Sequence, residues 1–206
     1  MTSTVEVFDI ELAFFGRACL GEHYSGDLAF IHEQGPDTFL AIVDAAGHGR
    51  AAHMIMLDVE NLMRTSETAS DADLTNLVQN LHNKLKGGRG AVIIAGNLNH
   101  ESLEFRYVRI GDSHGRVFGP AGRSLPGQAG MLGNVIPTPE VCSEILGVDD
   151  ILVLCTDGIS ERFDLAKISG SQTRSSDDLA HQIIEQFGKD HDDATCIVVR
   201  CKTHVE

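Results

Sequence analysis

Aspartates stand at the ends of four apolar, strand-like runs in this 206-residue chain, and the acidic positions are Asp27, Asp44, Asp157 and the pair Asp192-Asp193. A single aspartate at a strand end is ordinary, because its side chain hydrogen-bonds to nearby backbone in turns. The same arrangement occurs four times here, which favours a shared site over four unrelated turns.

Carboxylates at strand ends can meet if the strands lie in facing sheets. Carboxylates that cluster repel one another and raise one another's pKa unless cations neutralise them. Oxygen-only ligation suits the hard cations Mg²⁺ and Mn²⁺. Two such ions about 3.5–4 Å apart lower the pKa of a bridging water and hold a phosphoryl group for in-line displacement. The aspartates therefore predict metal-dependent hydrolysis of a phosphate ester.

Other routes to phosphate hydrolysis are disfavoured by residue spacing. A cysteine nucleophile of the phosphatase type needs an arginine six residues later, and Cys155 is followed at that distance by Glu161. No GxxxxGK[ST] phosphate-binding loop occurs. The His191-Asp192 pair precedes a β-like run instead of lying within a helix, which argues against an HD-type hydrolase.

The segment around Asp44 predicts how this carboxylate is positioned. Residues 28–43 form two β-rich runs around the turn residues Gln34-Gly35-Pro36-Asp37, which indicates a hairpin. Gly47-His48-Gly49 then turns the chain tightly. Apolar residues recur at helical spacing over 50–65 and again over 73–85. We therefore expect a strand-to-helix turn that carries Asp44, followed by two helices.

The second half of the chain is mostly strand-like. The expected elements are an antiparallel meander of 91–97, 102–110 and 115–118, a Gly- and Pro-rich surface loop over 120–139, strands near 140–146 and 150–156, a helix over 175–187 and a last strand over 194–201. Strands in hairpin groups and helices in pairs predict an α+β fold, with helices covering antiparallel sheets.

Composition limits the partners of the chain. A formal net charge of −14 without a basic run removes the electrostatic drive for nucleic-acid binding. The length fits a single domain spanning 1–206. The first thirty residues lack a signal-peptide pattern, and the apolar stretches are shorter than the roughly 20 residues that a membrane span needs. A cytoplasmic location is therefore expected.

Five short blocks, taken in chain order, resemble the signature of a known enzyme family. The blocks are Ser25-Gly26-Asp27, Asp44-Ala45-Ala46-Gly47-His48-Gly49, Gly111-Asp112, Thr156-Asp157-Gly158-Ile159 and Asp192-Asp193-Ala194-Thr195. Together they resemble the metal-dependent PPM-type protein serine/threonine phosphatases, and among these the bacterial SpoIIE class. The resemblance covers about 16–200. It implies a four-layer αββα sandwich of two antiparallel sheets, with a metal site at one end of the sheets.

The resemblance also implies roles for individual residues around Mn²⁺ or Mg²⁺, with two ions expected. Asp44 would bridge both ions, and Asp157 and Asp192 would complete the shell of one. Asp27 and the backbone carbonyl of Ala45 would hold the other. Asp44 and Asp157 would thus be the central catalytic residues.

Four further positions carry open alternatives. Asp193 is the less favoured ligand of its pair, because the family's ligand is the first residue of that block. Ala45 stands where the family commonly has glycine; alanine tolerates positive φ less well, so a weaker metal site is expected. Asp112 is interpreted as a turn residue, with a further acidic group in the site as the alternative. Arg17 is a candidate contact to the substrate phosphate, with a plain surface arginine as the alternative.

The resemblance is strongest to short, stand-alone feedback phosphatases of stressosome pathways. It implies phosphorylated STAS-domain regulatory proteins of a stressosome-like complex as substrates and partners. Two other functions stay open: a catalytically inactive, phosphatase-like binding module and a hydrolase of small phosphate esters. A pure binding module has no need to collect repelling carboxylates, whereas the small-ester hydrolase would share the site and differ only in its substrate.

Overall fold

Two antiparallel five-stranded sheets form the centre of the computed structural model, which describes residues 8–120 and 122–203. The first sheet has the order β1 (Phe8–Arg17), β10 (Ala194–Thr203), β9 (Ile151–Cys155), β6 (His114–Phe118) and β7 (Arg123–Ser124). The second has the order β2 (Asp27–Gln34), β3 (Asp37–Ala45), β4 (Ala91–Asn99), β5 (Glu104–Ile110) and β8 (Cys142–Ile145).

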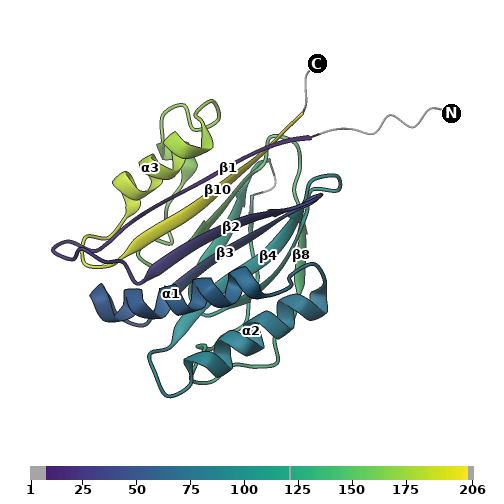
Figure 1. Cartoon of the computed structure of the whole chain (residues 1–206). Helices are drawn as coiled ribbons and strands as arrows, with labels where there is room; N and C mark the ends of the chain where they lie inside the picture. The colour runs from purple at the N-terminus through teal and green to yellow at the C-terminus, as the bar shows by residue number, and fades with distance from the viewer. Residues whose placement is uncertain (1–7, 121, 204–206) are drawn as a thin grey trace.

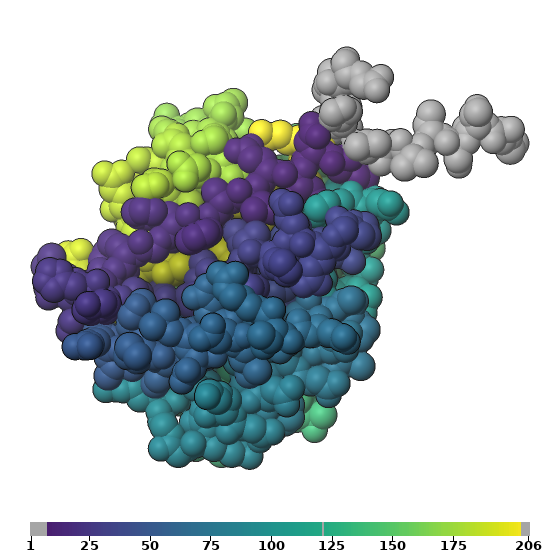
Figure 2. Space-filling view, viewed as in Figure 1, coloured from purple at the N-terminus to yellow at the C-terminus, as the bar shows by residue number. Residues whose placement is uncertain are grey.

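Helices cover the outer face of each sheet. The helices α1 (Gly49–Thr65) and α2 (Asp71–Leu85) pack on the second sheet, and α3 (Ser176–Phe187) packs on the first. Figure 1 shows these helices on opposite sides of the strands, and in Figure 2 the residues of α1 and α2 adjoin those of β2 on one face. The predicted four-layer αββα sandwich is confirmed.

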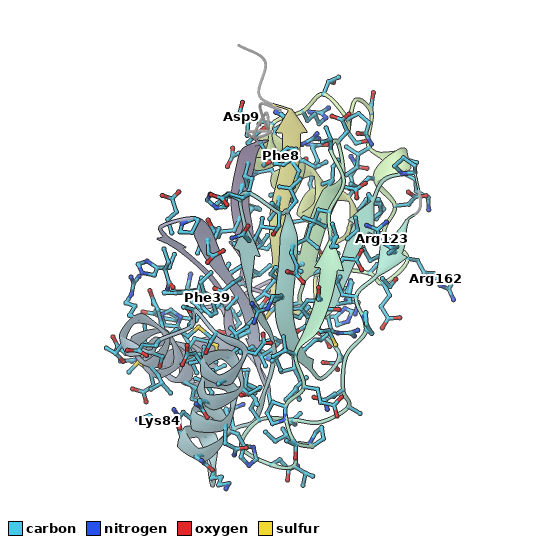
Figure 3. All side chains as sticks on the ribbon, turned by 90° about the vertical axis from the view of Figure 1, so that its right-hand side faces the viewer. Phe8, Asp9, Phe39, Lys84, Arg123 and Arg162 are labelled. Carbon is cyan, nitrogen blue, oxygen red and sulfur yellow. The ribbon has the colours of Figure 1, made fainter. Side chains whose placement is uncertain are left out.

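The alternation of side chains along β3 explains the layering. Successive side chains of a strand point to opposite faces of the sheet. Leu40 and Ile42 accordingly belong to the core between the two sheets, whereas Phe39, Ala41 and Val43 belong to the core beneath α1 and α2. Figure 3 shows Phe39 where the strands meet these helices. Both faces of β3 are buried, and its sequence is therefore a continuous apolar run.

Local capping explains where α2 and α3 begin. Ser70 caps α2 by accepting from the backbone N–H of Asp73, whose carboxylate accepts from the backbone of Ser70, a reciprocal capping box. Ser175 caps α3 in a similar way through the N–H of Asp178.

None of the helices in the described residues has the length and apolar character of a membrane span.

The strand pairing differs from the predicted meander in one respect. β4 and β5 pair as expected, but β6 leaves them and pairs with β9 in the first sheet. The chain crosses between the sheets at Gly111, whose φ of +99° is open to glycine at little cost. Strand β1, which the sequence patterns did not predict, pairs with β10 along its whole length.

Candidate metal centre

The aspartates at the strand ends come together at one end of the sandwich. Asp27 opens β2 and is the cross-strand partner of Asp44, near the end of β3. Asp157 follows β9 by two residues, and Asp192 precedes β10 by two residues. A cleft of about 160 Å³ opens here, and it is lined by Asp44, Ala45, Ala46, Gly47, Ala91, Val92, Asp112, Met131, Asp157 and Asp192.

Thr156 joins the two sheets at this end. Its hydroxyl donates to Asp27 Oδ2 at 2.8 Å and accepts from the backbone N–H of Thr195 at 3.0 Å. The side chain is fully buried. Sequence reasoning gave Thr156 no role, although a polar residue between an apolar strand and Asp157 was a signal that could have found it.

Three of the clustered carboxylates, those of Asp27, Asp44 and Asp192, have raised pKa values. Burial, together with the charges of Asp27 and Asp157, raises the pKa of Asp44 to about 9. Burial also raises the pKa of Asp27 to about 7, although the hydrogen bond from Thr156 opposes this rise. The pKa of Asp192 is raised as well, by burial and then by the charge of Asp157. Clustered, partly buried carboxylates of this kind are stabilised by a cation.

The donor set fits a hard divalent cation. Asp27 Oδ1 is buried and has no hydrogen-bond partner within residues 8–120 and 122–203. Among those same residues, no three His, Cys, Asp or Glu side chains are grouped to hold an ion by themselves. Carboxylate oxygens, such as those of Asp27 and Asp44, are the ligands that the hard cations Mg²⁺ and Mn²⁺ prefer. The carboxylates of the cleft therefore suit Mg²⁺ or Mn²⁺ better than a softer metal that prefers thiolate or imidazole ligands.

Asp193 has a different role from its neighbour Asp192. Its Oδ1 accepts from the backbone N–H of Cys19 at 2.8 Å, and its Oδ2 accepts from that of Gly26 at 2.7 Å. The side chain is only 3% exposed. Both oxygens are engaged by the segment that leads into Asp27, so Asp193 positions this segment.

Arg17 is not among the residues that line the cleft, and its guanidinium contacts the loop before β10. Its guanidinium donates to the carbonyl oxygens of Lys189, at 3.0 Å, and Ala18, at 3.3 Å, and lies 3.6 Å from Asp190. Lys189 in turn donates through Nζ to the backbone carbonyl of Asp157 at 2.5 Å. Arg17 and Lys189 thus tie the loop before Asp192 to the chain around Asp157.

In the turn after Asp44, glycines rather than Ala45 adopt the positive φ values. Ala45 is the last residue of β3 and does not have a positive φ, whereas Gly47 and Gly49 have φ values of +86° and +76°. The strain expected at Ala45 is therefore absent. Asp112 directly follows Gly111 after β5 and is exposed, and it lines the cleft from the loop side.

Comparison with known proteins finds one matching family and several solved structures with a similar fold. The family described as Stage II sporulation protein E (SpoIIE) matches residues 34–202. A chain from a structure of the bacterial stressosome is 25% identical and has a TM-score of 0.82, with 93% of this chain and 100% of that chain covered. RsbX in complex with magnesium is 19% identical, with a TM-score of 0.76 and coverage of 94% and 96%. The catalytic domain of the phosphatase PstP with two manganese ions is 16% identical, with a TM-score of 0.66 and coverage of 95% and 99%.

Proposed function

Because the chain belongs to the SpoIIE family of PPM-type phosphatases, we propose that it hydrolyses phosphoserine or phosphothreonine in a regulatory protein, in a reaction that depends on Mn²⁺ or Mg²⁺. The observation that carries this proposal is the convergence of Asp44, Asp157 and Asp192 on one cleft, beside Asp27 with its unpartnered oxygen. A fold that only bound a partner would gain nothing from carboxylates that repel one another.

Each side chain has a distinct task in this proposal. Asp44 is close enough to Asp27, Asp157 and Asp192 for their charges to raise its pKa, and it would bind both ions. Asp157 and Asp192, from the first sheet, would hold one ion, and Asp27 with the Ala45 carbonyl, from the second sheet, would hold the other. The bound ions would supply a water of lowered pKa and neutralise the phosphate charge.

The surrounding residues keep these ligands in place. Thr156 orients Asp27 by donating to Oδ2, which leaves Oδ1 for a cation. Lys189 fixes the backbone of Asp157, and Asp193 fixes the segment before Asp27. Residues that orient ligands in this way commonly matter to metal affinity by a factor of about 10–100.

The test is manganese-dependent release of phosphate from a phosphoserine peptide. The wild-type chain should turn over only with Mn²⁺ or Mg²⁺, and Asp44→Asn and Asp157→Asn should each abolish turnover. Asp58→Asn is the matched control, because Asp58 lies exposed on α1 and makes only a 3.9 Å ion pair with Lys84. No turnover with any divalent ion would support the inactive binding module instead.

The substrates that we propose are phosphorylated STAS-domain proteins of a stressosome-like complex. The similarity to a chain of a bacterial stressosome structure supports this choice. Rates on a purified phosphorylated STAS-domain protein, an unrelated phosphoprotein and a small phosphate ester should be compared. The STAS-domain protein should be hydrolysed fastest, whereas a preference for the small ester would identify a hydrolase of small molecules.

A further inference from the structure

A second hollow adjoins the aspartate cleft on the side of the loop that follows β7. It has a volume of about 330 Å³ and is lined by Val92, Gly111, Asp112, Ala129, Gly130 and Met131. Three of these residues, Val92, Asp112 and Met131, also line the cleft, so the two hollows lie side by side. Apart from Asp112, every lining side chain is apolar or is the hydrogen of a glycine. We call this hollow the Val92–Met131 groove.

The wall of the groove is held in place by backbone hydrogen bonds. Leu132 donates to the carbonyl of Ala91 at 2.8 Å, and Ala91 donates back at 3.2 Å. Gly111 donates to the carbonyl of Gln128 at 3.0 Å. These bonds tie the Gly- and Pro-rich loop to the start of β4 and the end of β5. The wall of the groove is therefore built by backbone pairing of this loop with the two strands.

Glycines set the positions of the two apolar side chains. A Cβ atom at Gly111 would lie 2.2 Å from Val92 Cγ1, and one at Gly90 would lie 2.3 Å from Met131 Sδ. Val92 and Met131 thus pack directly over glycine backbone. Met131 is nevertheless 36% exposed, so an apolar surface remains available beside the carboxylates.

The nature of the proposed substrate identifies the occupant. Consecutive Cα atoms of a polypeptide are 3.8 Å apart, so a residue next to a phosphoserine held in the cleft is within reach of an adjoining hollow. An acidic side chain there would face Asp112 and lose its hydration against Val92 and Met131. An apolar side chain would instead bury surface against both. We propose that the Val92–Met131 groove binds an apolar side chain within two residues of the phosphorylated residue, an inference that rests on the proposed function.

A peptide series tests the proposal. Phosphoserine peptides would differ only by Leu or Asp at one position, scanned over two residues on each side of the phosphoserine. At one position at least, kcat/KM with Mn²⁺ should be about 10-fold higher for Leu than for Asp, because apolar pockets discriminate by roughly 10–200-fold. Met131→Glu should reduce this ratio to about one. Val135→Glu is the matched control, because Val135 is 71% exposed on the same loop and lies outside the groove.

The outcomes distinguish failure of the groove proposal from failure of the phosphatase proposal. Turnover with equal kcat/KM at all four positions, or an unchanged ratio in Met131→Glu, would overturn the groove and leave the phosphatase proposal intact. If the wild-type chain hydrolyses no peptide, the proposed function fails, and binding then decides on the groove. Fluorescence anisotropy with labelled, non-hydrolysable phosphonate peptides in Mn²⁺ should still show about 10-fold tighter binding of the Leu peptide. Equal affinities in that measurement would refute the groove by itself.

Discussion

Each end of the sandwich has an aspartate beside a strand end, but the two aspartates differ in their hydrogen-bond partners. At the end away from the cleft, Asp150 directly precedes β9 and is 4% exposed. Its Oδ2 accepts from the N–H of Gly147 at 2.8 Å and from Arg123 Nη2 at 3.3 Å. Figure 3 shows Arg123 on the side of the molecule away from α2. At the cleft end, Asp27 Oδ1 is buried without a partner among the described residues.

In our proposal, this difference separates structural aspartates from metal ligands. A buried carboxylate that accepts hydrogen bonds from an arginine and a backbone N–H, as Asp150 does, stabilises the fold because its lone pairs are satisfied. Carboxylates that face one another with raised pKa values carry a cost in the folded protein, and such costs concentrate at functional sites. Partners, rather than burial, therefore distinguish Asp150 from Asp27 and Asp44.

The largest expected contrast concerns metal affinity. Asp44→Asn should weaken Mn²⁺ binding by on the order of 100-fold or more, since it removes a proposed ligand shared by both ions. Asp150→Asn makes the same change of charge at the other end and should leave Mn²⁺ affinity within about 2-fold of wild type. Isothermal titration calorimetry measures both. Equal losses in the two variants would mean that net charge, and not the cleft, governs binding.

Asp193 lies at the cleft end but has hydrogen-bond partners, so it should stabilise the fold as Asp150 does. Asp193→Ala leaves the buried N–H groups of Cys19 and Gly26 without their acceptor and should lower the free energy of unfolding by about 3 kcal/mol. Urea denaturation measures this change. Asp192→Ala is the comparison: it removes one hydrogen bond, from the N–H of Asp193 at 3.0 Å, together with a carboxylate whose pKa is raised, so it should cost less stability than Asp193→Ala. An Asp193→Ala protein as stable as wild type would show that the two hydrogen bonds are unimportant.

The pH dependence of stability in EDTA should come from the cleft end. The pKa values of Asp27 and Asp44 are raised from 3.8 to about 7 and about 9, so the folded state holds more protons than the unfolded state between about pH 4 and 9. Stability therefore falls as pH rises through this window. The Tm should drop on the order of 5 °C between pH 5.5 and 8.5.

Two variants make the origin of that drop testable. Asp44→Asn should flatten the pH profile, because it removes the group with the largest shift. Asp150→Asn changes the net charge by the same amount and should retain the drop. Mn²⁺ should raise the Tm more at pH 8.5 than at pH 5.5. A profile equally flat in both variants would assign the effect to overall charge.

The smallest effect is expected at Ala45. Its backbone already has an ordinary strand conformation, so a glycine there relieves no strain. Ala45→Gly should change the Mn²⁺ concentration for half-maximal activity by less than about 3-fold. Phosphate release at graded Mn²⁺ measures this value, and a tightening of 10-fold or more would show that the alanine methyl group weakens the site.

The sequence by itself determined most of the local elements, although not β1, and the acidic residues that we propose as metal ligands. The expected helices over 50–65, 73–85 and 175–187 lie within two residues of α1, α2 and α3, because apolar spacing and capping residues act over a few positions. Aspartates at strand ends similarly predicted a carboxylate cluster. The metal roles of these aspartates stay a prediction.

Only the tertiary structure decided how these parts meet. It assigned β6 and β9 to the first sheet and β5 and β8 to the second, and it paired Asp193 with Cys19, more than 170 positions away along the chain. It also brought Val92 and Met131 together beside the cleft. Strand pairing and side-chain contacts of this range depend on the packing of the whole chain, whereas sequence periodicity records only which face of an element is buried.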